Sequence, residues 1–100
     1  KTVIEQGRAD GKELCQLYNE VSAGGFSLEN AAKVPALMTL VNKYRNSEDK
    51  VYKGAFAEAI VEGYYGTEET GDAAIAKVED LLSNIDKALN IFNGGNKSED

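Results

Sequence analysis

The sequence predicts an all-α fold, a single-domain antiparallel bundle of about four helices, and three observations lead to that prediction. Apolar and small residues recur at steps of three and four along four segments, which is the period of an amphipathic helix. Short polar or glycine-rich linkers separate these segments, as between antiparallel neighbours. No segment has the alternating pattern of a strand. The length of 100 residues, 42% of them hydrophobic, fits one domain with a modest core.

The first predicted helix covers about residues 3–22. Its apolar or small positions recur every three or four residues, and they are Ile4, Gly7, Gly11, Leu14, Tyr18 and Val21. Charged and amide side chains occupy the opposite face, as in a helix with one side against a core. The stretch Ala23-Gly24-Gly25 is expected to end the helix, because glycine readily adopts the left-handed conformation of a C-cap.

Two glycines on the apolar face of this helix need compensation, since each costs about 1 kcal/mol of helix propensity relative to alanine. Close packing of Gly7 and Gly11 against another helix would supply it. An aromatic side chain of the third helix, Tyr52 or Phe56, is then expected against them. The alternative is a groove or ligand cleft beside the glycines. Gly7 and Gly11 are therefore candidate interaction residues.

The second predicted helix begins after Ser27, its N-cap, and extends to about Asn46. Pro35 lies inside this segment. A proline within a helix removes one backbone hydrogen bond and clashes with the preceding turn, at a cost of about 3 kcal/mol. The sequence therefore predicts a short helical turn through Lys33, a break or kink near Pro35, and the main helix beyond it.

The third predicted helix follows residues 45–50 (RNSEDK), where Asn46 or Ser47 is the expected cap. Acidic residues near this end would stabilise it through the helix dipole. Gly66 is expected to end the helix, and residues 66–72 (GTEETGD) are expected to form the next loop.

The fourth predicted helix has the most regular apolar stripe, formed by Ile75, Val78, Leu82, Ile85, Leu89 and Phe92. The pair Gly94-Gly95 is expected to end it. Residues 94–100 are then a flexible polar tail of the single helical domain 1–100.

The adjacent pair Tyr64 and Tyr65 is a second candidate for an interaction surface. Neighbouring helical positions point about 100° apart, so both rings can be buried only in an enclosed helix. An exposed ring would offer an aromatic anchor to a partner. The other tyrosines, Tyr18, Tyr44 and Tyr52, are expected at the core edge with their hydroxyls reaching water.

Composition disfavours several classes of function. The net charge of −6 argues against nucleic acid as a partner, which requires a basic face. The chain has no histidine, the commonest general base and transition-metal ligand, so we predict no catalytic, cofactor-binding or metal-ligating residue. The single cysteine, Cys15, lies beside the apolar stripe and is expected to be a buried structural thiol. The acidic clusters are expected to be solvated helix faces and ends.

Two short motifs, residues 11–15 (GKELC) and 42–44 (NKY), resemble those of small helical lipoproteins and secreted proteins of Bacteroidetes, many of unknown function. The resemblance covers about the first half of the chain. It implies export to the periplasm or cell surface, with membrane attachment only through a lipid anchor upstream of Lys1. It offers no catalytic residues.

Three hypotheses about function follow. The first is a non-enzymatic exported protein that binds an unknown protein or small ligand at the bundle surface. The second is an immunity or inhibitor protein, a small acidic bundle that blocks a basic toxin or nuclease site with help from charge steering. An enzyme is the third, and it is disfavoured because no nucleophile–base pair is evident.

Overall fold

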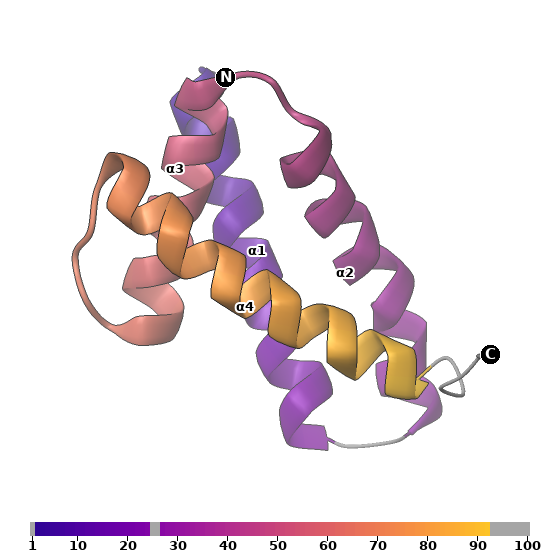
Figure 1. The fold of residues 1–100 in the computed structure, drawn as a ribbon. Coiled ribbons are helices and arrows are strands. Elements are labelled where there is room, and N and C mark those ends of the chain that lie inside the picture. The colour runs from indigo at the N-terminus through magenta and orange to yellow at the C-terminus, as the bar shows by residue number, and fades with distance from the viewer. Residues whose placement is uncertain (1, 25–26, 93–100) are drawn as a thin grey trace, which may run out of the picture.

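The computed structural model describes residues 2–24 and 27–92, and all the regular structure in them is helical. The elements in chain order are α1 (Val3–Gly24), α2 (Leu28–Asn46), α3 (Lys50–Ile60), the π-helix η1 (Val61–Tyr65) and α4 (Gly71–Phe92). The predicted all-α bundle is confirmed. Figure 1 shows α1 and α2 running in opposite directions, α3 lying beside α1 in the same direction, and α4 crossing the others obliquely.

Helix α1 extends two residues beyond the predicted end, to Gly24, and Gly25 lies outside the described residues. Most of its predicted apolar face is in the core, including fully buried Leu14 and Val21, which is 3% exposed. Ile4 is an exception, because 53% of its surface is exposed at the first turn of the helix. The periodic pattern therefore predicted the face correctly, but the neighbouring helices do not cover its first turn.

Of the break or kink predicted near Pro35, the break is not present, because α2 continues through Pro35 without interruption. A proline removes only one hydrogen bond from the helical ladder. Buried residues on both sides of it, Val34 before and Leu37 and Val41 after, fix the neighbouring turns against the core. Their burial offsets the local cost of the proline.

Helix α3 is capped by Asp49 rather than by the expected Asn46 or Ser47. The Asp49 carboxylate accepts hydrogen bonds from the backbone N–H groups of Val51 and Tyr52, at 2.9 and 3.4 Å. Asn46 and Ser47 are not available for this role because α2 extends through Asn46 and Ser47 is its C-cap.

The third helix changes to π geometry over η1 and ends at Gly66, as predicted. Gly66 has a φ of 72°, the left-handed conformation that glycine adopts without strain, and its N–H donates to the carbonyl of Val61 at 3.0 Å. Helix α4 begins at Gly71, inside the predicted loop, and ends at Phe92. Gly94, Gly95 and the predicted tail at 94–100 lie outside the described residues.

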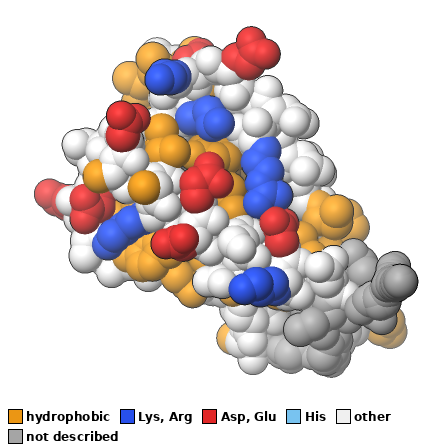
Figure 2. All heavy atoms as spheres, in the orientation of Figure 1, with side chains coloured by type: hydrophobic (Ala, Val, Ile, Leu, Met, Phe, Trp, Pro, Cys, Tyr) orange, Lys and Arg blue, Asp and Glu red, His pale blue; other side chains and the backbone are white. Residues whose placement is uncertain are grey.

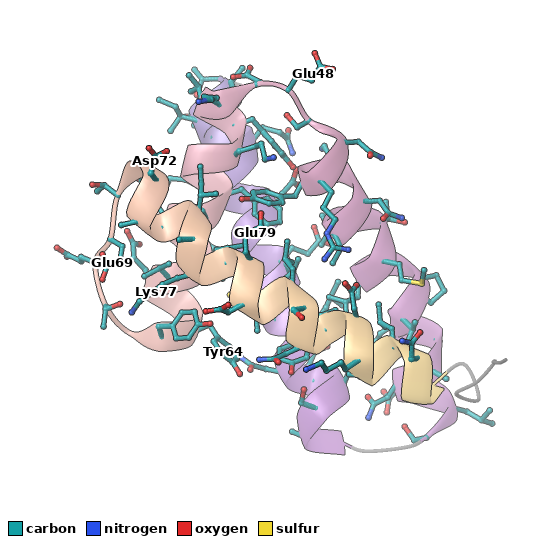
Figure 3. The ribbon with its side chains drawn as sticks, in the orientation of Figure 1. Glu48, Tyr64, Glu69, Asp72, Lys77 and Glu79 are labelled. Atoms are coloured by element: carbon teal, nitrogen blue, oxygen red, sulfur yellow. The ribbon has the colours of Figure 1, made fainter. Side chains whose placement is uncertain are left out.

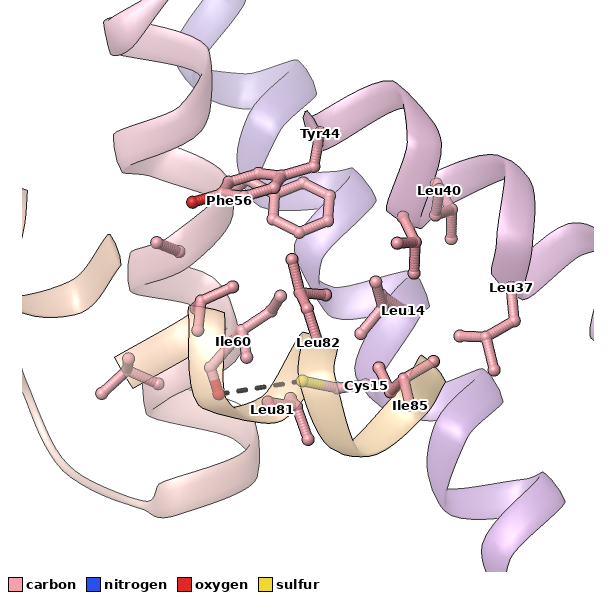
Figure 4. Close-up of a cluster of buried hydrophobic side chains, with 14 of the residues drawn as sticks. Leu14, Cys15, Leu37, Leu40, Tyr44, Phe56, Ile60, Leu81, Leu82 and Ile85 are labelled. Atoms are coloured by element: carbon pink, nitrogen blue, oxygen red, sulfur yellow. Dashed lines mark hydrogen bonds between the residues drawn. The ribbon is translucent and has the colours of Figure 1, made fainter. Parts of the chain in front are cut away.

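The core lies where α4 crosses the other helices (Figure 4). Its largest fully buried side chains are Tyr44, Phe56, Leu14, Leu37, Ile60, Leu81, Leu82 and Ile85. Tyr44 was expected to reach water, but it is fully buried against Phe56, with ring centroids 4.7 Å apart. Among the described residues its hydroxyl has no hydrogen-bond partner. Burial, assisted by the charge of Glu79, raises the pKa of Tyr44 to about 12.

Candidate functional site

The two candidate glycines of α1 lie directly against the backbone of α3. A Cβ added at Gly7 would stand 2.7 Å from the carbonyl oxygen of Tyr52, and one added at Gly11 would stand 2.5 Å from that of Phe56. Both distances are too short for a real contact, so α3 covers the glycines. The groove considered beside Gly7 and Gly11 is therefore not present at these positions.

The prediction that Tyr52 or Phe56 lies against the glycines is correct for the residues, but it is wrong in assigning the contact to their aromatic side chains. Tyr52 and Phe56 do face the glycines, but through their backbones. Only small side chains occupy the gap, since an added Cβ would stand 2.9 Å from that of Ala55 at Gly7 and 3.1 Å from that of Ala59 at Gly11. Small residues on both helices allow the two backbones to meet.

Cys15 is a buried thiol, as expected. Its Sγ–H donates to the carbonyl oxygen of Ile60 at 3.7 Å (Figure 4). Burial raises the pKa of Cys15 to about 11, so the reactive thiolate is scarce at neutral pH. A Cβ added at Gly63 would lie 3.5 Å from the sulfur, which places the thiol beneath the π-helix.

Three tyrosines meet at the surface around η1, and we refer to Tyr18, Tyr64 and Tyr65 as the tyrosine surface. The rings of Tyr64 and Tyr65 pack edge to face, with centroids 5.0 Å apart and an interplanar angle of 87°. The ring of Tyr18 lies 5.8 Å from that of Tyr64. Tyr64 is 39% exposed and Tyr65 is 36% exposed, so both of the adjacent rings reach solvent.

Contacts with α4 fix the position of Tyr65. Its hydroxyl donates to the carbonyl oxygen of Lys77 at 3.3 Å, and the Lys77 ammonium lies 5.1 Å from the ring centroid. Lys77 also pairs with Glu69 at 3.8 Å, and Figure 3 shows these two residues on the same face as Tyr64. Partial burial and then the nearby charge of Asp80 raise the pKa of Tyr65. The tyrosine surface is thus held in place by aromatic, hydrogen-bonding and cationic contacts.

A buried carboxylate forms a second notable site, which the sequence pattern did not reveal. Asp10 is 6% exposed and accepts hydrogen bonds from the Tyr52 hydroxyl at 2.7 Å and from Gln6 at 3.0 Å. The ammonium of Lys43 pairs with it at 2.9 Å. We refer to Asp10, Gln6, Lys43 and Tyr52 as the Asp10 clamp, because they join α1, α2 and α3.

Electrostatics favour the charged form of Asp10 in this clamp. Burial opposes ionisation, but hydrogen bonds from Tyr52 and Lys43 and the charge of Lys43 outweigh it, so the pKa of Asp10 falls below 3.8. Burial and then the hydrogen bond to Asp10 raise the pKa of Tyr52. Tyr52 therefore remains a hydrogen-bond donor at physiological pH, and Asp10 remains an acceptor.

A cleft of about 430 Å³ opens beside the Asp10 clamp. Its lining residues come from the first turns of α1, the end of α2 and the beginning of α3, and they are Val3, Gln6, Lys43, Asn46, Ser47, Asp49 and Tyr52. The Lys43 ammonium lies 5.6 Å from the Tyr52 ring centroid at this cleft. The site therefore combines apolar surface with a half-exposed cation.

One signal in the sequence could have located the clamp. Asp10 stands three residues after Gly7 and one before Gly11, so it shares their buried side of the helix. A carboxylate buried on that side of the helix must accept hydrogen bonds or pair with a cation, because an unpaired buried charge is costly. Those donors could not be identified in advance, because Tyr52 is 42 residues away along the chain.

Within residues 2–24 and 27–92, no three acidic or cysteine side chains are grouped so that they could hold a metal ion. None of the helices in this part of the chain combines the length and hydrophobicity needed to cross a bilayer. Comparison with protein-family models, curated proteins and solved structures gave no match for the chain.

Proposed function

We propose that the protein is a non-enzymatic, exported interaction module that binds another protein through the tyrosine surface. The observation that carries the proposal is the exposed, edge-to-face pair of Tyr64 and Tyr65. Tyrosine is enriched at protein interfaces because it offers a large contact area and a polar tip with few rotatable bonds. A pair already fixed by Lys77 and Tyr18 loses little conformational entropy on binding.

The non-enzymatic part of the proposal is supported by the absence of histidine from the sequence. The export part is supported by the resemblance of residues 11–15 and 42–44 to motifs of small exported helical proteins. Export would put the protein in the periplasm or at the cell surface, and any membrane attachment would come from a lipid anchor upstream of Lys1. The reading frame upstream of Lys1 tests this: we expect a signal peptide or a lipidation site, and a frame that encodes neither contradicts export.

Site-specific photocrosslinking in the source cells tests the tyrosine surface. A photoreactive phenylalanine would replace Tyr64 in one variant and Met38 of α2 in another. The two residues are equally exposed, at 39% and 38%, so Met38 is a matched control. We expect a discrete adduct from position 64 and none from position 38. Identical adducts from both positions, or none from either, would contradict the proposal.

Binding of a small ligand in the cleft is the second candidate function. The volume of about 430 Å³ lies within the usual range of ligand sites, and Lys43 supplies a polar group at an otherwise largely apolar wall. A panel of small aromatic compounds, observed by NMR on the labelled protein, tests this function. Shifts grouped at Val3, Gln6 and Lys43 would support it, and shifts elsewhere or no shifts would contradict it.

The acidic inhibitor considered from the sequence is a narrower form of the first function, since it also binds a protein. An acidic inhibitor would differ from a general interaction module in requiring a positively charged partner. That charge depends on how the acidic residues are distributed around the tyrosine surface.

A further inference from the structure

The negative charge of the chain is concentrated in one stretch. Residues 58–80 contain seven acidic residues and one lysine. The rest of the chain contains ten acidic and ten basic residues and is therefore neutral. Residues 58–80 thus account for the whole net charge of −6.

This acidic stretch is built around the tyrosine surface. It includes the end of α3, all of η1, the following loop and the first half of α4. Figure 3 shows Glu69 and Lys77 on the same side of α4 as Tyr64, with Glu79 on the other side of that helix, and Figure 2 shows carboxylates with basic side chains between them on this face. The charge of Asp80 acts on Tyr65, whose pKa it helps to raise after burial. Asp80 therefore lies close to the aromatic rings, whereas the charge of Glu79 acts on Tyr44 and Arg45.

Only part of this charge is neutralised within the protein. Arg8 lies 2.7 Å from Glu62 and 3.7 Å from Glu58, and Lys77 pairs with Glu69. In the described part of the chain, no cationic group comes within 4.0 Å of the three exposed carboxylates of Glu68, Glu79 and Asp80. These three carboxylates can accept charged hydrogen bonds from a partner.

The aromatic rings favour the same kind of partner. Lys77 already lies over the Tyr65 ring, which shows that a cation is accommodated at this surface. The ring of Tyr64 is 39% exposed beside it. Arginine combines stacking on an aromatic ring with bidentate bonds to carboxylates, and tyrosine and arginine are both frequent at the energetic centre of interfaces.

We infer that the partner is a basic protein surface, which places arginine side chains on the tyrosine surface and pairs with Glu68, Glu79 and Asp80. This inference rests on the proposed function and specifies the chemistry of its partner. Charge complementarity would speed the encounter, and the stacked tyrosines would slow dissociation.

The test uses a synthetic peptide of alternating arginine and glycine as the probe, titrated into the isotope-labelled full chain and followed by NMR. We expect shifts confined to residues 62–80 and to Tyr18. The affinity should fall by about tenfold in Tyr64→Ala, as for an interface anchor. It should also fall between about 0.05 M and about 0.5 M salt, because exposed charges are screened. Shifts spread over all carboxylates, or an unchanged affinity in Tyr64→Ala, would overturn the inference.

A pair of triple variants separates local recognition from general attraction to a polycation. One carries Glu68→Gln, Glu79→Gln and Asp80→Asn. The other carries Glu13→Gln, Glu29→Gln and Glu48→Gln, three exposed acids outside the acidic stretch. Both variants lose three negative charges, so an equal loss of affinity for the peptide in the two variants would overturn the inference. We expect the first to weaken binding by about tenfold more than the second, as for charge pairs at a specific interface.

The crosslinking experiment keeps this inference distinct from the proposed function. A discrete adduct at position 64 to a protein whose contact surface is not basic would overturn the inference and leave the function intact. Failure of crosslinking together with failure of peptide binding would overturn both. Unchanged thermal melting of each variant shows that loss of binding does not come from unfolding.

Discussion

The two neighbours of α1 are held to it by different means. On the α3 side, Gly7 and Gly11 allow backbone contact, with no room for even a methyl group. On the α2 side, the helices separate enough to leave the cleft, and Lys43 reaches across to Asp10. Small residues let the backbones of α1 and α3 meet, with Tyr52 of α3 also bonded to Asp10, whereas on the α2 side the contact across the wider gap is made by a long polar side chain.

All three basic residues of α2 connect it to other helices. Lys33 pairs with Glu20 of α1 at 3.0 Å, Lys43 with Asp10, and Arg45 with Asp86 of α4 at 2.8 Å. Exposed ion pairs contribute little because water and salt screen them. The difference teaches that the α1–α3 contact tolerates substitution least, while α2 is held mainly by its buried face and receives only a small contribution from its charge pairs.

Replacing Gly11 with leucine should have the largest effect. We expect the free energy of unfolding to fall by about 3 kcal/mol, at the upper end for an overpacked core, because even a Cβ would collide with the backbone at Phe56. Urea melts measure the loss. Gly54→Leu in α3 is the matched control, since an added Cβ there has no neighbour within 4 Å. Equal effects at Gly11 and Gly54 would show that the α1–α3 contact is not close.

The buried thiol should report on opening of the same contact. With a pKa of about 11, Cys15 should react with a thiol reagent at least about a hundredfold more slowly than an unperturbed cysteine at pH 8. The rate is measured by absorbance in native buffer, with the unfolded chain in denaturant as the control. Native labelling as fast as in denaturant would mean that α1 and η1 separate readily.

Loss of the Asp10 carboxylate tests the polar side of the comparison. In Asp10→Ala the Tyr52 hydroxyl loses its acceptor and Lys43 loses its counter-ion, so we expect a fall of about 1–3 kcal/mol in the free energy of unfolding. Glu13→Ala, on the exposed side of α1, is the control and should change little. A negligible effect at Asp10 would mean that packing alone holds α2 and α3 against α1 at this end.

The Asp10 carboxylate should also make the free energy of unfolding depend on pH. The pKa of Asp10 is lowered in the folded state, so its contribution is fully present above the ordinary value of 3.8 and is lost as the pH falls through the lower folded value. We therefore expect the stability gap between the natural chain and Asp10→Asn to narrow in acid. Denaturant melts across that range measure the gap, and a gap that widens in acid would contradict the assignment.

The smallest effect is expected at the outer edge of α2. Arg45 donates two hydrogen bonds to Asp86, at 3.2 and 2.8 Å, and both side chains are well exposed. Arg45→Lys loses the paired geometry, so stability should fall by about 0.5 kcal/mol at low salt and be unchanged at high salt. A double-mutant cycle with Asp86→Asn measures the coupling. If the coupling energy between Arg45 and Asp86 were as large as the loss of stability in Asp10→Ala, the exposed pair would contribute as much as the buried Asp10 clamp, contrary to our expectation.

The sequence by itself determined the helical segments of residues 2–24 and 27–92, the apolar faces of α1 and α4 and the end of η1 at Gly66. These features are local, since they depend on residues within a few turns and on the conformations open to glycine. It also indicated close packing at Gly7 and Gly11, although it assigned the contact to an aromatic side chain and not to the backbone of α3. The acidic stretch around Tyr64 is readable from the sequence as well, once the charges are counted segment by segment.

Only the tertiary structure decided which atoms meet across the helices. Continuation of α2 through Pro35 depends on burial of its neighbours, which outweighs a local cost. The Asp10 clamp depends on Tyr52, 42 residues away, and the exposure of Ile4 depends on where the other helices stop. Periodicity gives the face of each helix, but the partner of that face is set by packing between distant segments.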